Sequence, residues 1–112
     1  MFLRVVPLGN PDNEVLASVC AQLENLMKMK CRLLNKITMP PQAFNQWRKQ
    51  HNAEVIFQES RNIPEVKFID KEIPTMIITD QDIYYKGLNY VFGVQDPDTN
   101  CAVVSIARLQ PE

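Results

Sequence analysis

Apolar positions follow two different periods in the first thirty residues. Residues 2–8, FLRVVPL, form a short apolar run with two β-branched valines at its centre, which predicts a buried strand. After the polar stretch GNPDNE, apolar residues recur at spacings of three and four, which predicts an amphipathic helix from about residue 11 to 29. This stripe consists of Val15, Leu16, Val19, Cys20, Leu23, Leu26 and Met27.

The polar stretch before this helix carries the signals of a helix start. Asn10 is predicted as the N-cap and Pro11 as the first helical residue, while Asp12 and Glu14 suit the positive end of the helix dipole. The stretch also joins a strand to a helix, where phosphates often bind, but it has one glycine, no lysine and an acidic first turn. We therefore interpret it as a helix cap.

The middle of the chain predicts three further elements and one short segment. Residues 31–37, CRLLNKI, predict a second strand, and the tandem prolines after it favour an extended connection. A second helix is expected from about residue 48 to 60, a short extended segment at 66–69, and a buried strand at 75–79, TMIIT. The apolar face of the second helix consists of Ala53, Ile56, Phe57 and Ser60.

The last part of the chain, residues 87–109, has two apolar runs on either side of DPDTN. This pattern predicts a β-hairpin, with DPDTN as its turn. DPDTN also resembles the start of a calcium loop, but it lacks that loop's glycine and distal glutamate. The order β-α-β-α-β followed by an antiparallel pair predicts an α/β fold with a mixed, mostly parallel sheet. We expect residues 1–112 to form a single domain.

Composition and charge exclude several classes of partner. Of 112 residues, 46% are apolar and 22% charged, which is typical of a soluble globular protein. The net charge of −1 gives no field that favours nucleic acid or an anionic membrane. No apolar run approaches the ~20 residues of a spanning helix, and MFLRVVPLG is too short for a signal peptide. We expect a cytoplasmic chain with reduced cysteines and neither a nucleic-acid nor a membrane partner.

Side chains suited to metal binding or catalysis are few. The chain has one histidine, His51, and its cysteines lie 11 and 70 positions apart along the sequence, so no metal site and no catalytic residue is predicted. Asp80 and Asp82 flank Gln81 at the end of the third predicted strand. They could bind a cation or take part in acid–base chemistry, or they could form a solvated strand end with turn-forming side chains.

Three separated blocks of the sequence resemble, in order and spacing, the archaemetzincins, a metzincin-type branch of zinc-dependent metallopeptidases. The blocks are VVPLGNPDNEVL, AFNQWRKQHNAEVIF, and the pair GLNYVFG and AVVSIARL, and together they cover nearly the whole chain. The positions that carry the second and third blocks are Phe44, Asn45, Arg48, Gln50, Ala53, Gly87, Leu88, Asn89, Phe92, Gly93, Ser105, Arg108 and Leu109.

The resemblance implies the N-terminal half of such an enzyme, with a mixed five-stranded sheet, one antiparallel edge strand and two helices. The family's HExxHxxGxxH segment, which binds the catalytic zinc, is absent from these residues. Zinc is thus implied for the complete enzyme and not for this chain, which we expect to be inactive alone. The edge strand, about residues 88–94, would bind an extended peptide substrate. The implied substrate-binding residues are Leu88, Asn89, Tyr90, Val91, Phe92 and Gly93.

Two other functions stay open at the level of sequence. The chain could be a non-catalytic interaction module that uses the same exposed edge strand for a partner strand, or that self-associates through exposed sheet surface. It could also be an unrelated small-molecule binding domain with a polar pocket near Asp80 and Asp82.

Overall fold

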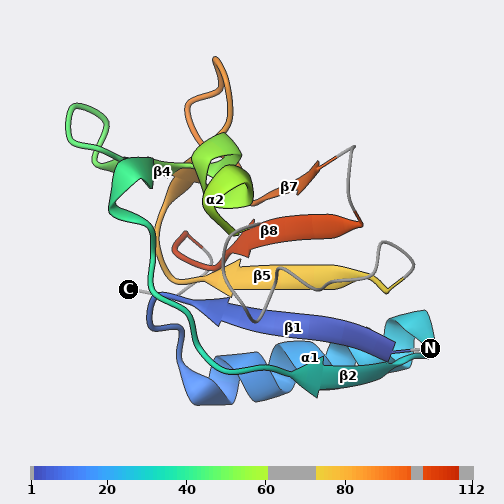
Figure 1. Ribbon diagram of the computed structural model, residues 1–112. Helices are drawn as coiled ribbons and strands as arrows, with labels where there is room; N and C mark the ends of the chain where they lie inside the picture. The colour runs from blue at the N-terminus through green and yellow to red at the C-terminus, as the bar shows by residue number, and fades with distance from the viewer. Residues whose placement is uncertain (1, 61–72, 97–99, 109–112) are drawn as a thin grey trace.

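The computed structural model describes residues 2–60, 73–96 and 100–108. In these residues a five-stranded sheet has a long helix on one face and a short helix on the other (Figure 1). The elements are β1 Phe2–Leu8, α1 Asn13–Met27, β2 Lys30–Leu33, the 3-10 turn Pro41–Ala43, β3 Phe44–Asn45, β4 Gln50–Asn52, α2 Ala53–Ser60, β5 Thr75–Thr79, β6 Ile83–Tyr84, β7 Gly93–Asp96 and β8 Cys101–Ser105.

The main sheet has the predicted mixed topology. Its strand order is β2-β1-β5-β8-β7, in which the first four strands are parallel and β7 pairs antiparallel with β8. The α/β fold with one antiparallel edge strand is therefore confirmed. A small second sheet, β3-β4-β6, lies beside the β7 edge of the main sheet and was not predicted.

Strand β1 lies between both helices, which explains its nearly continuous apolar run. Leu3 and Val5 pack on the α1 face, whereas Val6 and Leu8 pack on the α2 face. A strand that is buried on both faces needs apolar residues at successive positions, because neighbouring side chains point to opposite sides. Gly9 then turns the chain with φ of 79°, and a Cβ there would come 2.8 Å from an oxygen of Asp80.

Helix α1 begins two residues later than predicted, because Asp12 rather than Asn10 is its N-cap. The Asp12 carboxylate accepts hydrogen bonds from the backbone amides of Glu14 and Val15, at 2.7 and 3.3 Å. The helix ends at Met27, before Lys28 in the left-handed conformation. Leu26 is 77% exposed, so the buried stripe ends earlier than predicted.

Two other predicted elements have different limits in the structure. Strand β2 stops at Leu33 instead of residue 37, although Ile37 still forms an isolated bridge with Leu8. Helix α2 begins at Ala53 rather than residue 48, because residues 50–52 form β4. The predicted apolar face of α2 agrees with the structure at Ala53, Ile56 and Phe57, which are buried. The predicted segment at 66–69 lies outside the described residues.

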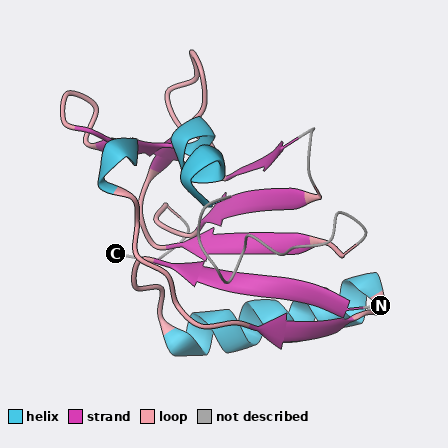
Figure 2. Ribbon diagram, in the orientation of Figure 1, coloured by secondary structure: helices cyan, strands magenta, loops and turns pink. Residues whose placement is uncertain are grey.

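The first arm of the predicted hairpin is also shifted. Residues 88–92 lie in a loop, and only Gly93 and Val94 of the predicted 88–94 strand belong to β7, which continues to Asp96. Figure 2 shows this β6–β7 loop and the β3–β4 loop extending away from the main sheet on its β7 side. None of the described helices is long and apolar enough to cross a membrane.

Candidate functional site

The β3–β4 loop, residues 46–49, is folded by the side chain of one asparagine. The Asn45 carboxamide oxygen accepts hydrogen bonds from the backbone amides of Trp47 and Arg48, at 3.0 and 3.2 Å. The Lys49 amide closes the turn on the Asn45 carbonyl at 2.8 Å, with Lys49 in the left-handed conformation. Asparagine favours such turns because its short side chain reaches the amides two and three residues on. This turn directs Arg48 toward the β6–β7 loop.

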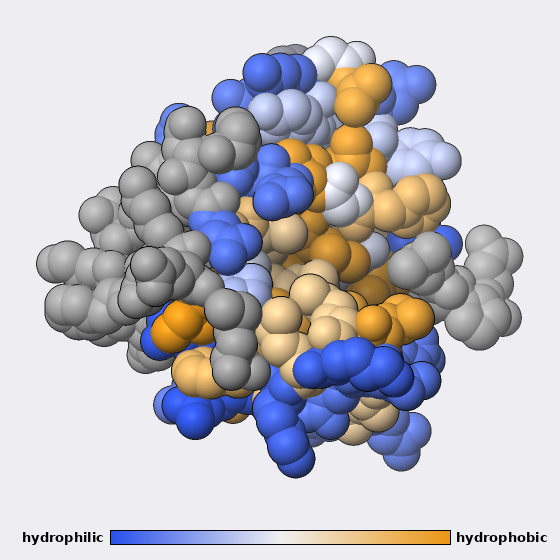
Figure 3. Space-filling model, turned by 90° about the vertical axis from the view of Figure 1, so that its right-hand side faces the viewer, coloured by the Kyte–Doolittle hydropathy of each residue, from blue (hydrophilic) through white to orange (hydrophobic). Residues whose placement is uncertain are grey.

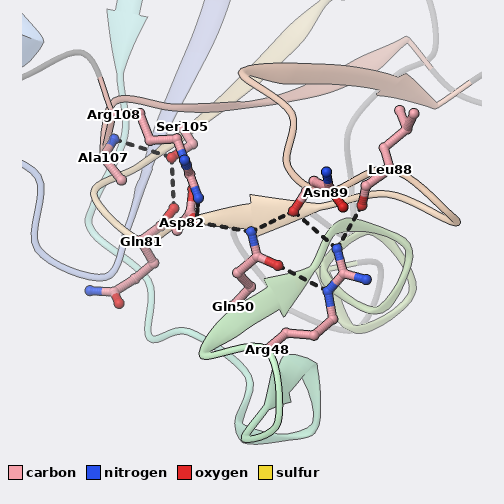
Figure 4. Close-up of polar contacts among 9 residues, drawn as sticks. All are labelled: Arg48, Gln50, Gln81, Asp82, Leu88, Asn89, Ser105, Ala107 and Arg108. Atoms are coloured by element: carbon pink, nitrogen blue, oxygen red, sulfur yellow. Dashed lines mark hydrogen bonds and ion pairs between the residues drawn. The ribbon is translucent and has the colours of Figure 1, made fainter.

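Arg48 binds two backbone carbonyls of the β6–β7 loop (Figure 4). One guanidinium nitrogen, Nη2, donates to the carbonyls of Leu88 and Asn89, at 2.6 and 3.0 Å. Its Nε donates to the Gln50 carboxamide oxygen at 2.9 Å. The guanidinium carbon lies 3.9 Å from the centroid of the Tyr84 ring. Arg48 thus links loops that lie forty residues apart in the sequence.

Gln50, which is 6% exposed, continues this set of contacts inward. Its Nε2 donates to the Asn89 carbonyl at 2.7 Å and to the Asp82 carboxylate at 2.9 Å (Figure 4). The Gln50 carboxamide oxygen accepts a hydrogen bond from Arg48, and the nitrogen donates to two acceptors. These partners set the orientation of the carboxamide group. A buried carboxamide with these partners fixes the positions of the groups around it.

Asp82 and Arg108 form the other end of the network. Two nitrogens of Arg108, Nε and Nη2, donate to the two oxygens of Asp82, each at 2.9 Å. The hydrogen bonds from Arg108 lower the pKa of the Asp82 carboxyl, and the one from Gln50 acts in the same direction. The Arg108 guanidinium also lies 3.9 Å from the centroid of the Tyr90 ring. We name the set Arg48, Gln50, Asp82 and Arg108 the polar network.

The predicted pair Asp80 and Asp82 does not form a shared carboxylate site. Asp82 is held by Arg108, whereas Asp80 accepts hydrogen bonds from the Asn10 amide and the Gln81 side chain, at 3.1 and 3.3 Å. In residues 2–60, 73–96 and 100–108, no three His, Cys, Asp or Glu side chains are grouped so as to hold a metal ion. The separate contacts of the two aspartates therefore favour the interpretation as a strand end with turn-forming side chains.

The His51 amide donates to the Asp82 carbonyl at 2.9 Å, but the His51 side chain and the cysteines make no hydrogen bond to the side chains of the polar network among the described residues. The His51 ring is half-buried beside the Phe44 ring, 5.0 Å between centroids, and its buried Nδ1 has no hydrogen-bond partner. Burial lowers the pKa of His51. All three cysteines lie in the described residues, and none of them forms a disulfide bond. The Cys31 thiol donates to the Cys20 carbonyl at 3.5 Å, and burial raises the pKa of Cys31 to about 11.

The implied substrate-binding residues lie mostly in the β6–β7 loop. Leu88, Tyr90 and Phe92 are 56%, 41% and 47% exposed, and the Tyr90 and Phe92 rings meet edge to face with centroids 5.4 Å apart. Asn89 is exposed, whereas Val91 is half-buried and its amide donates to the Ile83 carbonyl at 3.1 Å. The structure therefore brings three apolar side chains and Gly93 to the surface along one segment of chain.

Strand β7 is an edge of the main sheet, and no strand of the described residues pairs with its outer side. The Ser105 amide donates to the Phe92 carbonyl at 2.8 Å, and Gly93 lies opposite Val104. In an antiparallel pair, hydrogen-bonded and non-hydrogen-bonded positions alternate. The amide and carbonyl groups of Gly93 and Gln95 therefore point away from β8, and both residues are exposed.

The opposite edge of the sheet has a different character. Strand β2 carries Lys30 and Arg32, both exposed, and charged side chains hinder the pairing of a further strand at an edge. Strand β7 has Gly93 and Gln95 as its exposed residues and no lysine or arginine. Figure 3 shows hydrophobic residues gathered across the middle of one side of the molecule, between a polar upper part and a strongly hydrophilic lower edge.

Sequence reasoning offered Asp82, with Asp80, a possible role in cation binding or acid–base chemistry, and assigned no role to the rest of the polar network. Arg48, Gln50 and Arg108 were visible only as positions that match the family. The loop partners of Arg48 and Gln50 are backbone carbonyls, which every residue has. No pattern of side chains marks such an acceptor, so the contacts became visible only in the structure.

Comparisons with known proteins give one consistent result, although no family model matches the chain. The archaemetzincin of Methanocaldococcus jannaschii is 32% identical over all of this chain and 58% of its own length. The archaemetzincins of Haloquadratum walsbyi and Pyrococcus furiosus are each 30% identical, over 98% and 99% of this chain and 60% and 59% of their own. The chain thus spans about three fifths of the length of these relatives.

Solved structures agree with the sequence comparison. The archaemetzincin of Archaeoglobus fulgidus, in complex with malonate, matches 99% of this chain and 64% of its own with a TM-score of 0.80 at 23% identity. That of Methanopyrus kandleri matches 98% and 61% with a TM-score of 0.78 at 24% identity. The resemblance is therefore confirmed in sequence and in fold, and the chain aligns with about three fifths of these archaemetzincins.

Proposed function

We propose that this chain is the N-terminal part of an archaemetzincin-like zinc-dependent metallopeptidase and supplies the edge strand along which an extended peptide substrate binds. The relatives named above, which are archaemetzincins, support the class of enzyme. The observation that carries the binding role is the open edge of β7, where Gly93 and Gln95 present outward-facing amide and carbonyl groups. An extended peptide pairs with such an edge through main-chain hydrogen bonds.

The β7 edge suits a peptide better than the β2 edge does. A peptide strand that paired with β2 would lie next to the ammonium group of Lys30 and the guanidinium group of Arg32. These charged groups would lose part of their hydration, which opposes pairing at this edge. At β7 the neighbouring exposed side chains are Phe92 and Gln95, beside the loop that carries Leu88 and Tyr90. Main-chain pairing supplies affinity, and apolar contacts beside it supply selectivity.

The residues of this chain do not fit a catalytic zinc ion. Such a site takes three protein ligands, commonly histidine nitrogens or thiolate sulfurs. The sequence has one histidine, and the raised pKa of the Cys31 thiol opposes the thiolate form that zinc requires. In this proposal the ligands and the general base of the complete enzyme come from outside these 112 residues. The chain by itself binds peptide without hydrolysing it.

A proline at position 95 tests the edge directly. Gln95→Pro removes an outward-facing amide, whereas β7 keeps the hydrogen bonds that it makes to β8 through Val94. We expect a fluorescein-labelled extended octapeptide to bind Gln95→Pro about fivefold more weakly than wild type, by fluorescence anisotropy. Gln95→Ala keeps the amide and is the matched control, with unchanged affinity. Equal affinities of the proline and alanine variants would contradict the proposal.

The alternative of a non-catalytic interaction module uses the same edge. The exposed apolar side chains of Leu88, Tyr90 and Phe92 favour it, because such groups also promote association between protein chains. In that case light scattering would show association that increases with concentration, and Gln95→Pro would reduce it. Binding of the octapeptide by a monomer favours the substrate role instead.

A further inference from the structure

The β6–β7 loop is attached to the rest of the fold by backbone hydrogen bonds at its β7 end. The Val91 amide donates to the Ile83 carbonyl at 3.1 Å, and the Phe92 carbonyl accepts from the Ser105 amide at 2.8 Å. Earlier in the loop the carbonyls of Leu88 and Asn89 accept hydrogen bonds from the side chains of Arg48 and Gln50. The exposed part of the loop is thus attached through two side chains of the β3–β4 segment.

We propose that Arg48 and Gln50 are positioning residues that hold the β6–β7 loop in one conformation, so that Leu88, Tyr90 and Phe92 form a preformed contact surface for an apolar side chain of the bound peptide. The part that concerns peptide rests on the function proposed above. The part that concerns the loop does not, and it is measured without ligand.

The geometry of Arg48 is specific to a guanidinium group. One nitrogen contacts two successive carbonyls, while Nε contacts Gln50 and the planar group lies over the Tyr84 ring at 3.9 Å. A lysine ammonium keeps the charge but has no second nitrogen to contact Gln50 at the same time, and it does not stack as a plane. The orientation of the loop therefore depends on the fork shape and not on the charge alone.

Gln50 links the β6–β7 loop to Asp82. Because it is 6% exposed and its Nε2 also donates to Asp82, its amide is fixed on the side of the core. Asp82 in turn holds Arg108 over the Tyr90 ring. The polar network therefore fixes the loop at two points, the backbone at Leu88 and Asn89 and the ring of Tyr90.

The surface held in this way suits an apolar partner group. Tyr90 and Phe92 meet edge to face, and Leu88 lies two residues before Tyr90 with 56% of its side chain exposed. Aromatic side chains that are already ordered lose little conformational freedom on binding, so more of the contact energy appears as affinity. Contact of a leucine or phenylalanine side chain of the peptide with this surface would increase the affinity, whereas contact of a serine would not.

The first experiment measures loop order in the free chain by ¹⁵N relaxation of the amides of residues 86–92. We expect Arg48→Met to increase fast motion throughout this segment and Arg48→Lys to do so by a smaller amount. Arg32→Met is the matched control, since Arg32 also lies over an aromatic ring, that of Phe2 at 4.2 Å, but on the opposite edge of the sheet. Unchanged order in Arg48→Met would overturn the proposal.

The second experiment measures selectivity with two octapeptides that differ by leucine or serine at one position. We expect wild type to prefer the leucine peptide about tenfold, and Arg48→Met to lose most of this preference while keeping a similar affinity for the serine peptide. Arg48→Lys should restore part of the ratio. Gln50→Leu, which keeps the volume and removes the donor, should behave like Arg48→Met if the arginine variant does not fold. A preference that survives both substitutions refutes the positioning role, whereas no binding of either peptide by wild type refutes the proposed function and leaves the relaxation result valid.

Discussion

At the residue scale, His51 shows how burial changes the pKa of an ionisable side chain. The sequence predicted no metal site at this single histidine, and the structure places it on β4 with its ring against Phe44. Its Nδ1 is buried without a partner, and burial lowers its pKa, although Asp82 and Asp80 act in the opposite direction. The folded state therefore favours the neutral ring.

This environment predicts a specific dependence of stability on pH. A lowered pKa in the folded state means that the unfolded chain binds the proton more readily, so the free energy of unfolding is highest above the ordinary histidine pKa of about 6.5. It falls as the pH drops from there through the lowered pKa of the folded state. His51 is the one histidine in the chain, and the carboxyl groups titrate mainly at lower pH.

We expect the urea midpoint of wild type to decrease between about pH 7.5 and about pH 5.5, and His51→Phe to be nearly independent of pH in this range. Phenylalanine keeps a ring against Phe44 and removes the titrating nitrogen. A decrease of the same size in His51→Phe would show that another group causes it.

At the element scale, the elements with the strongest apolar patterns were predicted well. The limits of β1 and β5 agree with the prediction, and α1 covers most of the predicted range. Apart from the local N-cap of α1, two further errors lie where polar contacts between distant segments decide the conformation. Residues 50–52 form a strand because they pair with β3 and β6, and residues 88–92 leave the strand where Arg48 and Gln50 bind their carbonyls.

Alanine substitutions in the two helices test which of the predicted core positions are buried. Ile56 of α2 is fully buried, and truncation of such a residue leaves a cavity, so Ile56→Ala should lower the free energy of unfolding by about 2–5 kcal/mol. Leu26 belongs to the predicted stripe of α1 but is 77% exposed, so Leu26→Ala should change it by less than about 0.5 kcal/mol. Denaturant titrations of the two variants measure both effects, and similar losses would mean that Leu26 is covered in solution.

At the scale of the whole molecule, the chain combines the β7 edge, at which we propose that peptide binds, with a sequence that lacks the family's zinc-binding segment. We expect the purified chain, with one equivalent of zinc, to show no metal-dependent hydrolysis of unstructured peptides, because the sequence has one histidine and the described residues contain no group of metal ligands. A fluorogenic peptide library, with a chelator as the control, measures this. Turnover that requires zinc at one equivalent and stops with chelator would contradict the expectation.

The sequence by itself determined the order of the main elements, the parallel arrangement of the sheet and the resemblance to the archaemetzincins. These depend on apolar periodicity and on residue identity, which are local properties of the chain. Only the tertiary structure decided that residues 88–92 are a loop, that Gly93 and Gln95 present their backbone groups outward, and that Arg48 and Gln50 hold the loop. The loop contacts join side chains to backbone carbonyls about forty residues away, and backbone groups are the same for nearly every residue type.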